Sequence, residues 1–327
     1  MLTGSLSLNL QQKILAAAAG FLFAVIFFSD EAEAQSLIEW RKEIALTFDD
    51  APRGDGPLMS GSARTQTLIN ALEAARVEGA LFFVTTKHLD EAPAGKARLN
   101  AYLAAGHHIA NHSHNHPWLR SSTPEDYLAD VDTAAGKLDA FEGVLPYFRY
   151  PYLDEGDTRQ KRLAVRDGLK ARNLANGYVT IDNHDWYLQA LVGEAIAAKH
   201  PMNIDVLRET YVEVLMDAVT FYNSIAQEIL GRSPRHVLLL NENDLAALFV
   251  DDLVAALRAD GWSIIPAPDA YEDDIASMIP DTEFNGQGRV AALAHLSGKS
   301  PADLVAPVSG EEYLRALFAE RGLIPPG

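Results

Sequence analysis

Short apolar runs alternate with amphipathic stretches from Ile38 onward, and this alternation restricts the fold more than any other feature of the chain. Apolar runs of four or five residues indicate buried strands, and longer amphipathic stretches indicate helices that pack against them. Strands that alternate with helices are typical of βα units around a parallel sheet. The predicted strands cover residues 44–48, 80–84, 108–110, 147–150, 177–181, 237–240 and 262–265, and the predicted helices cover 62–78, 96–105, 124–141 and 251–259.

Polar side chains follow five of these strands at the point where each strand ends. They are Asp49 and Asp50, His112 and His116, Arg149, Asp182 and Asp185, and Asn241. In barrels and open α/β sheets, ligands bind at the carboxyl ends of the strands. Turn chemistry alone explains Asn and Asp at such positions, but it does not explain the histidines. The sequence therefore predicts an α/β fold with one site at this edge of the sheet.

The segment from His112 to His116 indicates a metal site. Two histidines four residues apart on one helical turn would lie about 6 Å apart at Cβ, and both could bind one divalent ion. Two adjacent carboxylates after a strand are expected to point opposite ways, so one of Asp49 and Asp50 can bind the metal while the other faces the substrate. One Asp and two His suit Zn²⁺, Co²⁺, Ni²⁺ or Mn²⁺ and leave a coordination position open.

The carboxylate that does not bind the metal could act as a general base toward a water molecule that the metal activates. Arg149 could hold this base ionised and oriented, since a nearby cation lowers the pKa of a carboxyl group. A surface salt bridge is the alternative role for Arg149. The residues alone thus favour a metal-dependent hydrolase.

Composition excludes several classes of partner. The apolar content of 48% and the charged content of 22% are those of a globular protein with a sizeable core. The formal charge of −18 argues against nucleic acid and anionic membrane surfaces, since both attract clustered Lys and Arg. The chain has no cysteine, so a metal ion must be held by His, Asp or Glu.

The first 34 residues are predicted to be a secretory signal peptide. Lys13 precedes an apolar run over 14–28, and Ala32-Glu33-Ala34 is a small-x-small cleavage pattern before Gln35. An uncleaved single-span anchor is the alternative, and in both cases the working domain lies outside the cytoplasm. A cysteine-free exported chain suits a bacterial periplasm, and secretion is also consistent with it.

Four motifs, in this order, resemble those of the polysaccharide deacetylases (carbohydrate esterase family 4). They are Thr47-Phe48-Asp49-Asp50, His112-Ser113-x-x-His116, Arg149-x-Pro151-Tyr152 and Asp182-x-x-Asp185-Trp186. The resemblance implies a distorted, incomplete (β/α) barrel that removes acetyl groups from amino sugars or acetylated polysaccharides with one divalent metal ion, Zn²⁺ first among the candidates. The expected domain covers 36–275, with a helical insertion over 187–230 and a C-terminal extension over 276–327.

The resemblance also implies roles for single residues. Asp49 would be the general base, oriented by Arg149. The metal ligands would be Asp50, His112 and His116. The backbone N–H of Tyr152, next to Pro151, would help to hold the oxyanion of the reaction, and Trp186 would line the acetyl pocket. Asp185 would be the partner of the general acid, and Asn241 would lie at the substrate.

Asn241 departs from the family pattern, which places a general-acid histidine at this position. Asparagine cannot deliver a proton at neutral pH, and the loss of a general acid typically costs about 10²–10⁴ in rate. One interpretation is that His184 or Glu242 supplies the proton. His236 is a poorer candidate, because it lies at the start of the strand, roughly 16 Å from its end.

Two other interpretations of Asn241 remain open. In the first, the substrate carries an O-acetyl ester, because an alcohol leaves more readily than an amine. Alternatively, the chain is a metal-bearing carbohydrate-binding protein that has lost turnover, although the retained Asp49 and Arg149 argue against this. Without the resemblance, the ligands would equally fit a hydrolase of a cyclic amide or phosphoester, and the net negative charge disfavours a phosphorylated substrate.

Overall fold

The computed structural model describes residues 41–92 and 94–325. The signal peptide predicted at 1–34 lies outside this range. Within the described ranges, no helix is long and apolar enough to cross a membrane.

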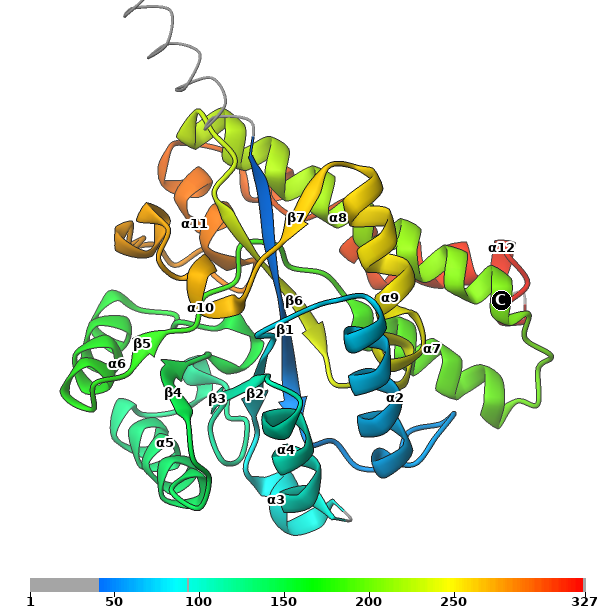
Figure 1. The fold of residues 1–327 in the computed structure, drawn as a ribbon. Coiled ribbons are helices and arrows are strands. Elements are labelled where there is room, and N and C mark those ends of the chain that lie inside the picture. The colour runs from blue at the N-terminus through cyan, green and yellow to red at the C-terminus, as the bar shows by residue number, and fades with distance from the viewer. Residues whose placement is uncertain (1–40, 93, 326–327) are drawn as a thin grey trace, which may run out of the picture. The chain divides into compact units, whose positions relative to one another are not determined.

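A seven-stranded parallel sheet lies at the centre of the domain, and its longest strand, β1, runs between β2 and β6 (Figure 1). The strand order is β5-β4-β3-β2-β1-β6, and β7 pairs with the start of β1. The strands are β1 (Lys42–Ala51), β2 (Leu81–Val84), β3 (His108–Asn111), β4 (Val144–Phe148), β5 (Ala175–Asn176), β6 (Arg235–Asn241) and β7 (Trp262–Ile264). Because all pairs are parallel, the strands end at one edge of the sheet.

Residues 175–183 run from β4 across to β6 and bend the sheet into a distorted barrel. The N–H of Gly177 donates to the carbonyl of Phe148 in β4 at 2.7 Å, and four residues later Ile181 bridges to Leu238 in β6. A strand predicted over 177–181 is therefore wrong in its bounds. This segment changes partner from β4 to β6, so it cannot keep a regular ladder with either. The expected distorted, incomplete (β/α) barrel is confirmed.

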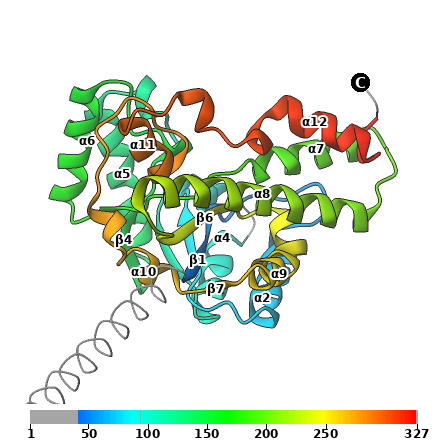
Figure 2. The same ribbon diagram turned by 90° about the horizontal axis from the view of Figure 1, so that it is seen from above.

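Helices cover the outside of the sheet. They are α2 (Gly61–Ala74), α3 (Lys87–Glu91), α4 (Gly95–Ala104), α5 (Pro124–Leu138), α6 (Arg159–Ala171), α7 (Asp185–Ala197), α8 (Ile204–Leu230), α9 (Asp244–Ala259), α10 (Ala267–Ala270), α11 (Gly288–Leu296) and α12 (Glu311–Glu320). Helix α9 packs between α2 and α8, while α11 packs on α8 and α12 on α7 (Figure 2). The long helical stretch predicted at 187–230 therefore consists of α7 and α8.

Helix boundaries follow the capping residues. The side chain of Thr123 accepts a hydrogen bond from the N–H of Asp126 and begins α5 as predicted. The helix predicted over 251–259 begins earlier, at Asp244, because the side chain of Asn243 accepts from the N–H of Ala246. This early start places the first turn of α9 directly behind the end of β6.

The core is formed by apolar side chains between the sheet and its helices. Phe82 of β2 stacks on Phe48 of β1 at 4.8 Å between ring centroids and on Tyr102 of α4 at 3.9 Å. All three rings are fully buried, and each buried aromatic side chain stabilises the fold by roughly 1.5–3 kcal/mol relative to exposure. This packing fixes the end of β1, where the polar side chains begin.

Candidate active site

A cleft of about 540 Å³ opens at the carboxyl ends of the strands. Its walls come from the ends of β1 and β6, from the loops after β3 and β4, and from the segment around Asp182. The lining residues are Asp49, Asp50, Arg53, His112, His116, Trp118, Tyr152, Leu153, Asp182, Asn183, His184, Trp186, Leu239, Asn241, Gly286 and Glu311. The structure thus brings together most of the residues that the sequence singled out, while Arg149, Pro151 and Asp185 lie behind the walls.

Asp50, His112 and His116 form a cluster that could hold one metal ion. One ligand atom from each lies within 4.8 Å of the other two, and Nε2 of His116 is 3.6 Å from Oδ1 of Asp50. Ligands at about 2.0–2.2 Å from a tetrahedral zinc ion lie roughly 3.4 Å from one another. The cluster therefore fits a divalent ion after small side-chain movements.

Local backbone geometry differs from two predictions at this cluster. Asp50 has a φ of 67° and lies at an irregularity in the pairing of β1 with β2, so Asp49 and Asp50 both face the cleft. The expected alternation of the two carboxylates is wrong, because it requires extended backbone. The two histidines lie on a loop and not on a helical turn, because Ser113 and His116 have φ values of 70° and 57°.

The hydrogen bonds around the cluster orient the side chains that could bind a metal ion. His112 Nδ1 donates to the carbonyl of Arg149 at 2.9 Å, which leaves the Nε2 lone pair for a metal ion. The hydroxyl of Thr85 donates to Oδ1 of Asp50 at 3.1 Å, and Nδ2 of Asn241 lies 3.4 Å from Oδ2. Such partners would fix the direction of these candidate ligands before an ion binds.

The protonation states also suit a metal ion. Burial lowers the pKa of His112 to about 4 and the pKa of His116 to about 4, so both imidazoles are neutral near pH 7. Burial opposes ionisation of Asp50, but His116 and Arg53 outweigh it and hold the pKa of this carboxyl below its usual range. Metal ions require neutral imidazole and ionised carboxylate, so the donor set fits the ion that the family resemblance implies.

Replacing His116 by alanine is expected to weaken Zn²⁺ binding more than 100-fold. Even residues that only orient a ligand typically contribute about 10–100-fold to metal affinity, and His116 would be a ligand itself. Isothermal titration calorimetry of Zn²⁺ into metal-free protein measures this change. His114→Ala is the control, because His114 lies on the same loop but contacts Thr86 and does not line the cleft. Equal affinities of the two variants would exclude His116 as a ligand.

Asp49 forms a buried ion pair with Arg149. Nη1 of Arg149 donates to Oδ1 of Asp49 at 2.6 Å and to Oγ1 of Thr47 at 2.8 Å. Nε donates to the carbonyl of Gly177, and Nη2 to the hydroxyl of Tyr271 at 3.0 Å. Arg149 is fully buried, so a surface salt bridge is excluded. Burial raises the pKa of Asp49 to about 6, and Arg149 opposes this rise.

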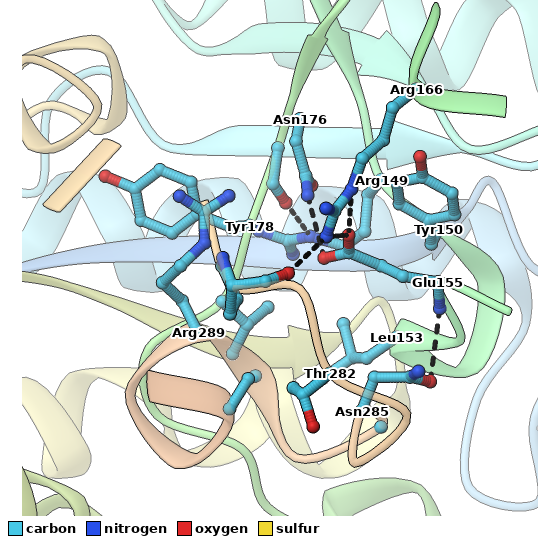
Figure 3. Close-up of a pocket in the computed structure, with 16 residues that line it drawn as sticks. Arg149, Tyr150, Leu153, Glu155, Arg166, Asn176, Tyr178, Thr282, Asn285 and Arg289 are labelled. Carbon is cyan, nitrogen blue, oxygen red and sulfur yellow. Dashed lines mark hydrogen bonds and ion pairs between the residues drawn. The ribbon is translucent and has the colours of Figure 1, made fainter. Parts of the chain in front are cut away.

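A second polar network lies around a small cavity that Arg149 also lines (Figure 3). Glu155 accepts from Nη2 of Arg166 at 2.6 Å and from Nδ2 of Asn176 at 3.0 Å. Arg166 also donates to the carbonyl of Pro280 at 2.7 Å. Together with Arg149, these residues line a small cavity of about 20 Å³. Residues beyond 275, Pro280 among them, therefore line the cavity beside Arg149.

The end of β6 is held from behind by Asp185. Its Oδ2 accepts from the backbone N–H of Asn241 at 2.8 Å and from Nδ2 of Asn243 at 2.9 Å, while its Oδ1 is buried without a hydrogen-bond partner among the described residues. Burial raises the pKa of Asp185 to about 7. Oδ1 of Asn241 is also buried without a partner in the described part of the chain.

The structure separates the three candidates for proton supply. Glu242 is fully buried and accepts from Nη2 of Arg98 and from the hydroxyl of Tyr102, both at 2.8 Å, so it points away from the cleft. His236 is fully buried at the start of β6. Only His184 lines the cleft, and burial lowers its pKa, so it is neutral near pH 7.

Sequence reasoning missed several residues of the cleft. Arg53 lies on the loop after β1, with Nη1 3.6 Å from Oδ2 of Asp50. Trp118 lies two residues after His116, and its ring is 4.5 Å from that of Tyr152. Its aromatic character so close to the second histidine was a usable signal. Glu311 gave no signal, because it comes from the far C-terminal part of the chain.

Comparisons with known proteins agree with the motifs. A family model described as polysaccharide deacetylase matches residues 39–172. A chitooligosaccharide deacetylase from a Bradyrhizobium species is 31% identical over 175 residues, which cover 52% of this chain and 72% of that protein. Chitin deacetylase 1 of Cryptococcus neoformans is 25% identical over 200 residues, and the match covers 59% of this chain but only 39% of that protein.

Among solved structures, the chitin deacetylase of Colletotrichum lindemuthianum is similar to this chain with a TM-score of 0.49. Sequence identity is 18%, and the match covers 72% of this chain and 89% of that one.

Proposed function

The chain belongs to the polysaccharide deacetylase family, and on this premise we propose that it removes acetyl groups from N-acetylated sugar oligomers or polymers by metal-dependent hydrolysis. The observation that carries the proposal is Asp49, which pairs with the buried Arg149 and lines the same cleft as the cluster of Asp50, His112 and His116. An oriented base next to a metal site serves hydrolysis, and a protein that only binds sugar has no use for it.

Each residue of the site has a proposed task. Asp50, His112 and His116 would hold the divalent ion, with Zn²⁺ the first candidate. The ion would polarise the acetyl carbonyl and lower the pKa of the attacking water. Asp49 would take a proton from this water, and a base with a pKa of about 6 is mostly ionised at pH 7. Arg149 would keep Asp49 pointed at the water.

The walls of the cleft have proposed roles as well. The backbone N–H of Tyr152 would donate to the oxyanion that forms as water attacks the acetyl carbon. Trp186 is 41% exposed and lines the cleft, which suits a wall of the acetyl pocket. A second hollow of about 620 Å³ adjoins the first and shares Asp50, Arg53, His116 and Trp186 with it. This continuation favours an oligomeric or polymeric substrate.

We also propose that the protein is exported to a bacterial periplasm or secreted, with residues 1–34 as the signal peptide and the deacetylase domain over 36–275. Acetylated polysaccharides of cell surfaces are found outside the cytoplasm, so this location would bring enzyme and substrate together. The C-terminal extension over 276–327 would complete the cleft, since Gly286 and Glu311 contribute to its lining.

An O-acetyl ester remains the alternative substrate, because Asn241 cannot donate the proton that a leaving amine needs. Acetate release from N-acetylglucosamine oligomers and from O-acetylated xylose oligomers of matched length, each with added Zn²⁺, separates the two. We expect the N-acetyl oligomers to react at least as fast as the O-acetyl ones. A preference of tenfold or more for O-acetyl oligomers would favour the esterase alternative, and Asp49→Asn is the control for release by contaminants.

A further inference from the structure

Asp182 is a buried carboxyl group in the cleft that none of the roles above uses. It is 6% exposed and lines the same cleft as Asp49 and Asn241. The residue before it, Ile181, bridges to Leu238, and the side chain of the residue after it, Asn183, donates to the carbonyl of Leu239. The backbone therefore holds Asp182 beside the last residues of β6, close to the place where Asn241 stands.

The surroundings of Asp182 keep a proton on it. The titratable groups that face it are Asp49 from β1, Asp185 from the start of α7 and Tyr222 from α8. Among the residues that the structure describes, no Lys, Arg or His makes an ion pair with it. Burial, with a further contribution from the Asp49 charge, raises the pKa of Asp182 to about 8. Asp182 is thus a neutral carboxylic acid near pH 7.

We propose that Asp182 is the general acid of this site and protonates the leaving group in place of the residue that Asn241 replaces. This role rests on the proposed deacetylation. His184 also lines the cleft, but a neutral imidazole is a weak proton donor. Glu242 is excluded by its buried hydrogen bonds with Arg98 and Tyr102.

The protons balance over one turnover. Asp49 takes one proton from water as the oxygen of that water bonds to the acetyl carbon. Asp182 then gives its proton to the sugar nitrogen as the C–N bond breaks, and acetic acid and the amine leave. Asp49 now holds one proton more and Asp182 one fewer, so proton transfer through solvent in the cleft restores both.

A cation bound by Asp50, His112 and His116 would lower the pKa of Asp182. Its positive charge lowers the pKa of nearby carboxyl groups, so the pKa of Asp182 would move from about 8 toward neutrality. General acids work best when their pKa lies near the working pH. The side chain of Asn241 contacts Asp50, one of the proposed metal ligands. Asn241 would therefore help to position Asp50, a task that does not need the imidazole of a histidine.

The test compares two leaving groups in the Asp182→Asn protein loaded with Zn²⁺. Release of acetate from N-acetylglucosamine oligomers requires a protonated amine, whereas 4-nitrophenyl acetate releases a stable phenolate without acid help. We expect kcat for the oligomers to fall by about 10²–10⁴-fold, and kcat for 4-nitrophenyl acetate to stay within a few-fold of wild type. In the wild type, kcat for the oligomers should fall at high pH as Asp182 loses its proton. In Asp182→Asn this fall should disappear, since no acid remains to be deprotonated.

Three results would overturn this role. Full activity of Asp182→Asn on the oligomers would exclude it, and an equal loss on both substrates would show a structural task instead. Activity of Asp182→Glu no higher than that of Asp182→Asn would also count against it, because the glutamate keeps the acid. A wild-type protein that releases acetate from neither substrate would overturn the proposed function itself, which is a different result from an active Asp182→Asn.

Discussion

Replacing Asp49 by asparagine is expected to lower kcat for acetate release from N-acetylglucosamine oligomers by about 10²–10⁴-fold. Asparagine is close in shape to aspartate, but its amide cannot accept the proton of water at neutral pH. Steady-state measurement of acetate at saturating Zn²⁺ gives the change. KM should vary much less, because Asp49 would act on the water and not on the sugar.

The same variant carries its own control. Asp50, His112 and His116 are unchanged in Asp49→Asn, so the affinity for Zn²⁺ should stay within several-fold of wild type. Loss of both zinc binding and activity would assign Asp49 to the metal instead. Retention of more than a tenth of the wild-type kcat would mean that another group is the base.

Replacing Arg149 by methionine is expected to destabilise the fold by about 3–5 kcal/mol, since it leaves the buried Asp49 carboxylate without its partner. Urea unfolding at pH 7 measures the change in the free energy of unfolding. The pKa of Asp49 should also rise above about 6, because Arg149 now lowers it. The acid limb of the kcat/KM profile should therefore move to higher pH, as more of the base is protonated at a given pH.

An exposed arginine provides the matched control. Arg159 pairs with Asp281 at the same 2.6 Å, but its side chain is 70% exposed, so Arg159→Met should cost less than about 1 kcal/mol. The double variant Asp49→Asn, Arg149→Met should be more stable than Arg149→Met alone, because no buried charge is left unpaired. An equal cost of the two arginine substitutions would contradict the buried pair.

The sequence predicted the fold class because the signals are local. Strand β1 and strand β6 read as apolar runs, and Thr123 marks the start of a helix whose beginning the structure confirms. The segment over 177–181 also reads as a strand. The strand to which it is hydrogen-bonded changes from β4 to β6 along its length. Such a change depends on the tertiary structure and leaves no pattern in the local sequence.

The candidate site was also predicted only in part from the sequence. The motifs predicted that Asp49, Asp50 and the two histidines lie in one site. They did not predict the backbone conformation of these residues. Asp50 and His116 have positive φ values, although the sequence predicted a strand end for the first and a helical turn for the second. Such conformations persist only where the surrounding packing holds the backbone in them. Glu311 joins the same cleft from the other end of the chain, and no spacing rule connects residues so far apart.

Asn241 illustrates how structure narrows a question that sequence leaves open. Sequence proximity made Glu242 and His184 equal candidates for the missing acid. The structure places Glu242 in a buried network with Arg98 and Tyr102, and His184 in the cleft but neutral. Asp182 was visible in the sequence as the first residue of the fourth motif, yet only its burial and its neighbours indicate that it holds a proton.

The most direct test of the central claim is acetate release from N-acetylglucosamine oligomers while Zn²⁺ is added to metal-free protein. The site of Asp50, His112 and His116 predicts that the rate rises with added Zn²⁺ until one ion is present per chain and then stays constant. An unchanged rate in metal-free protein, or no acetate at any Zn²⁺ concentration, would contradict metal-dependent deacetylation at this cleft.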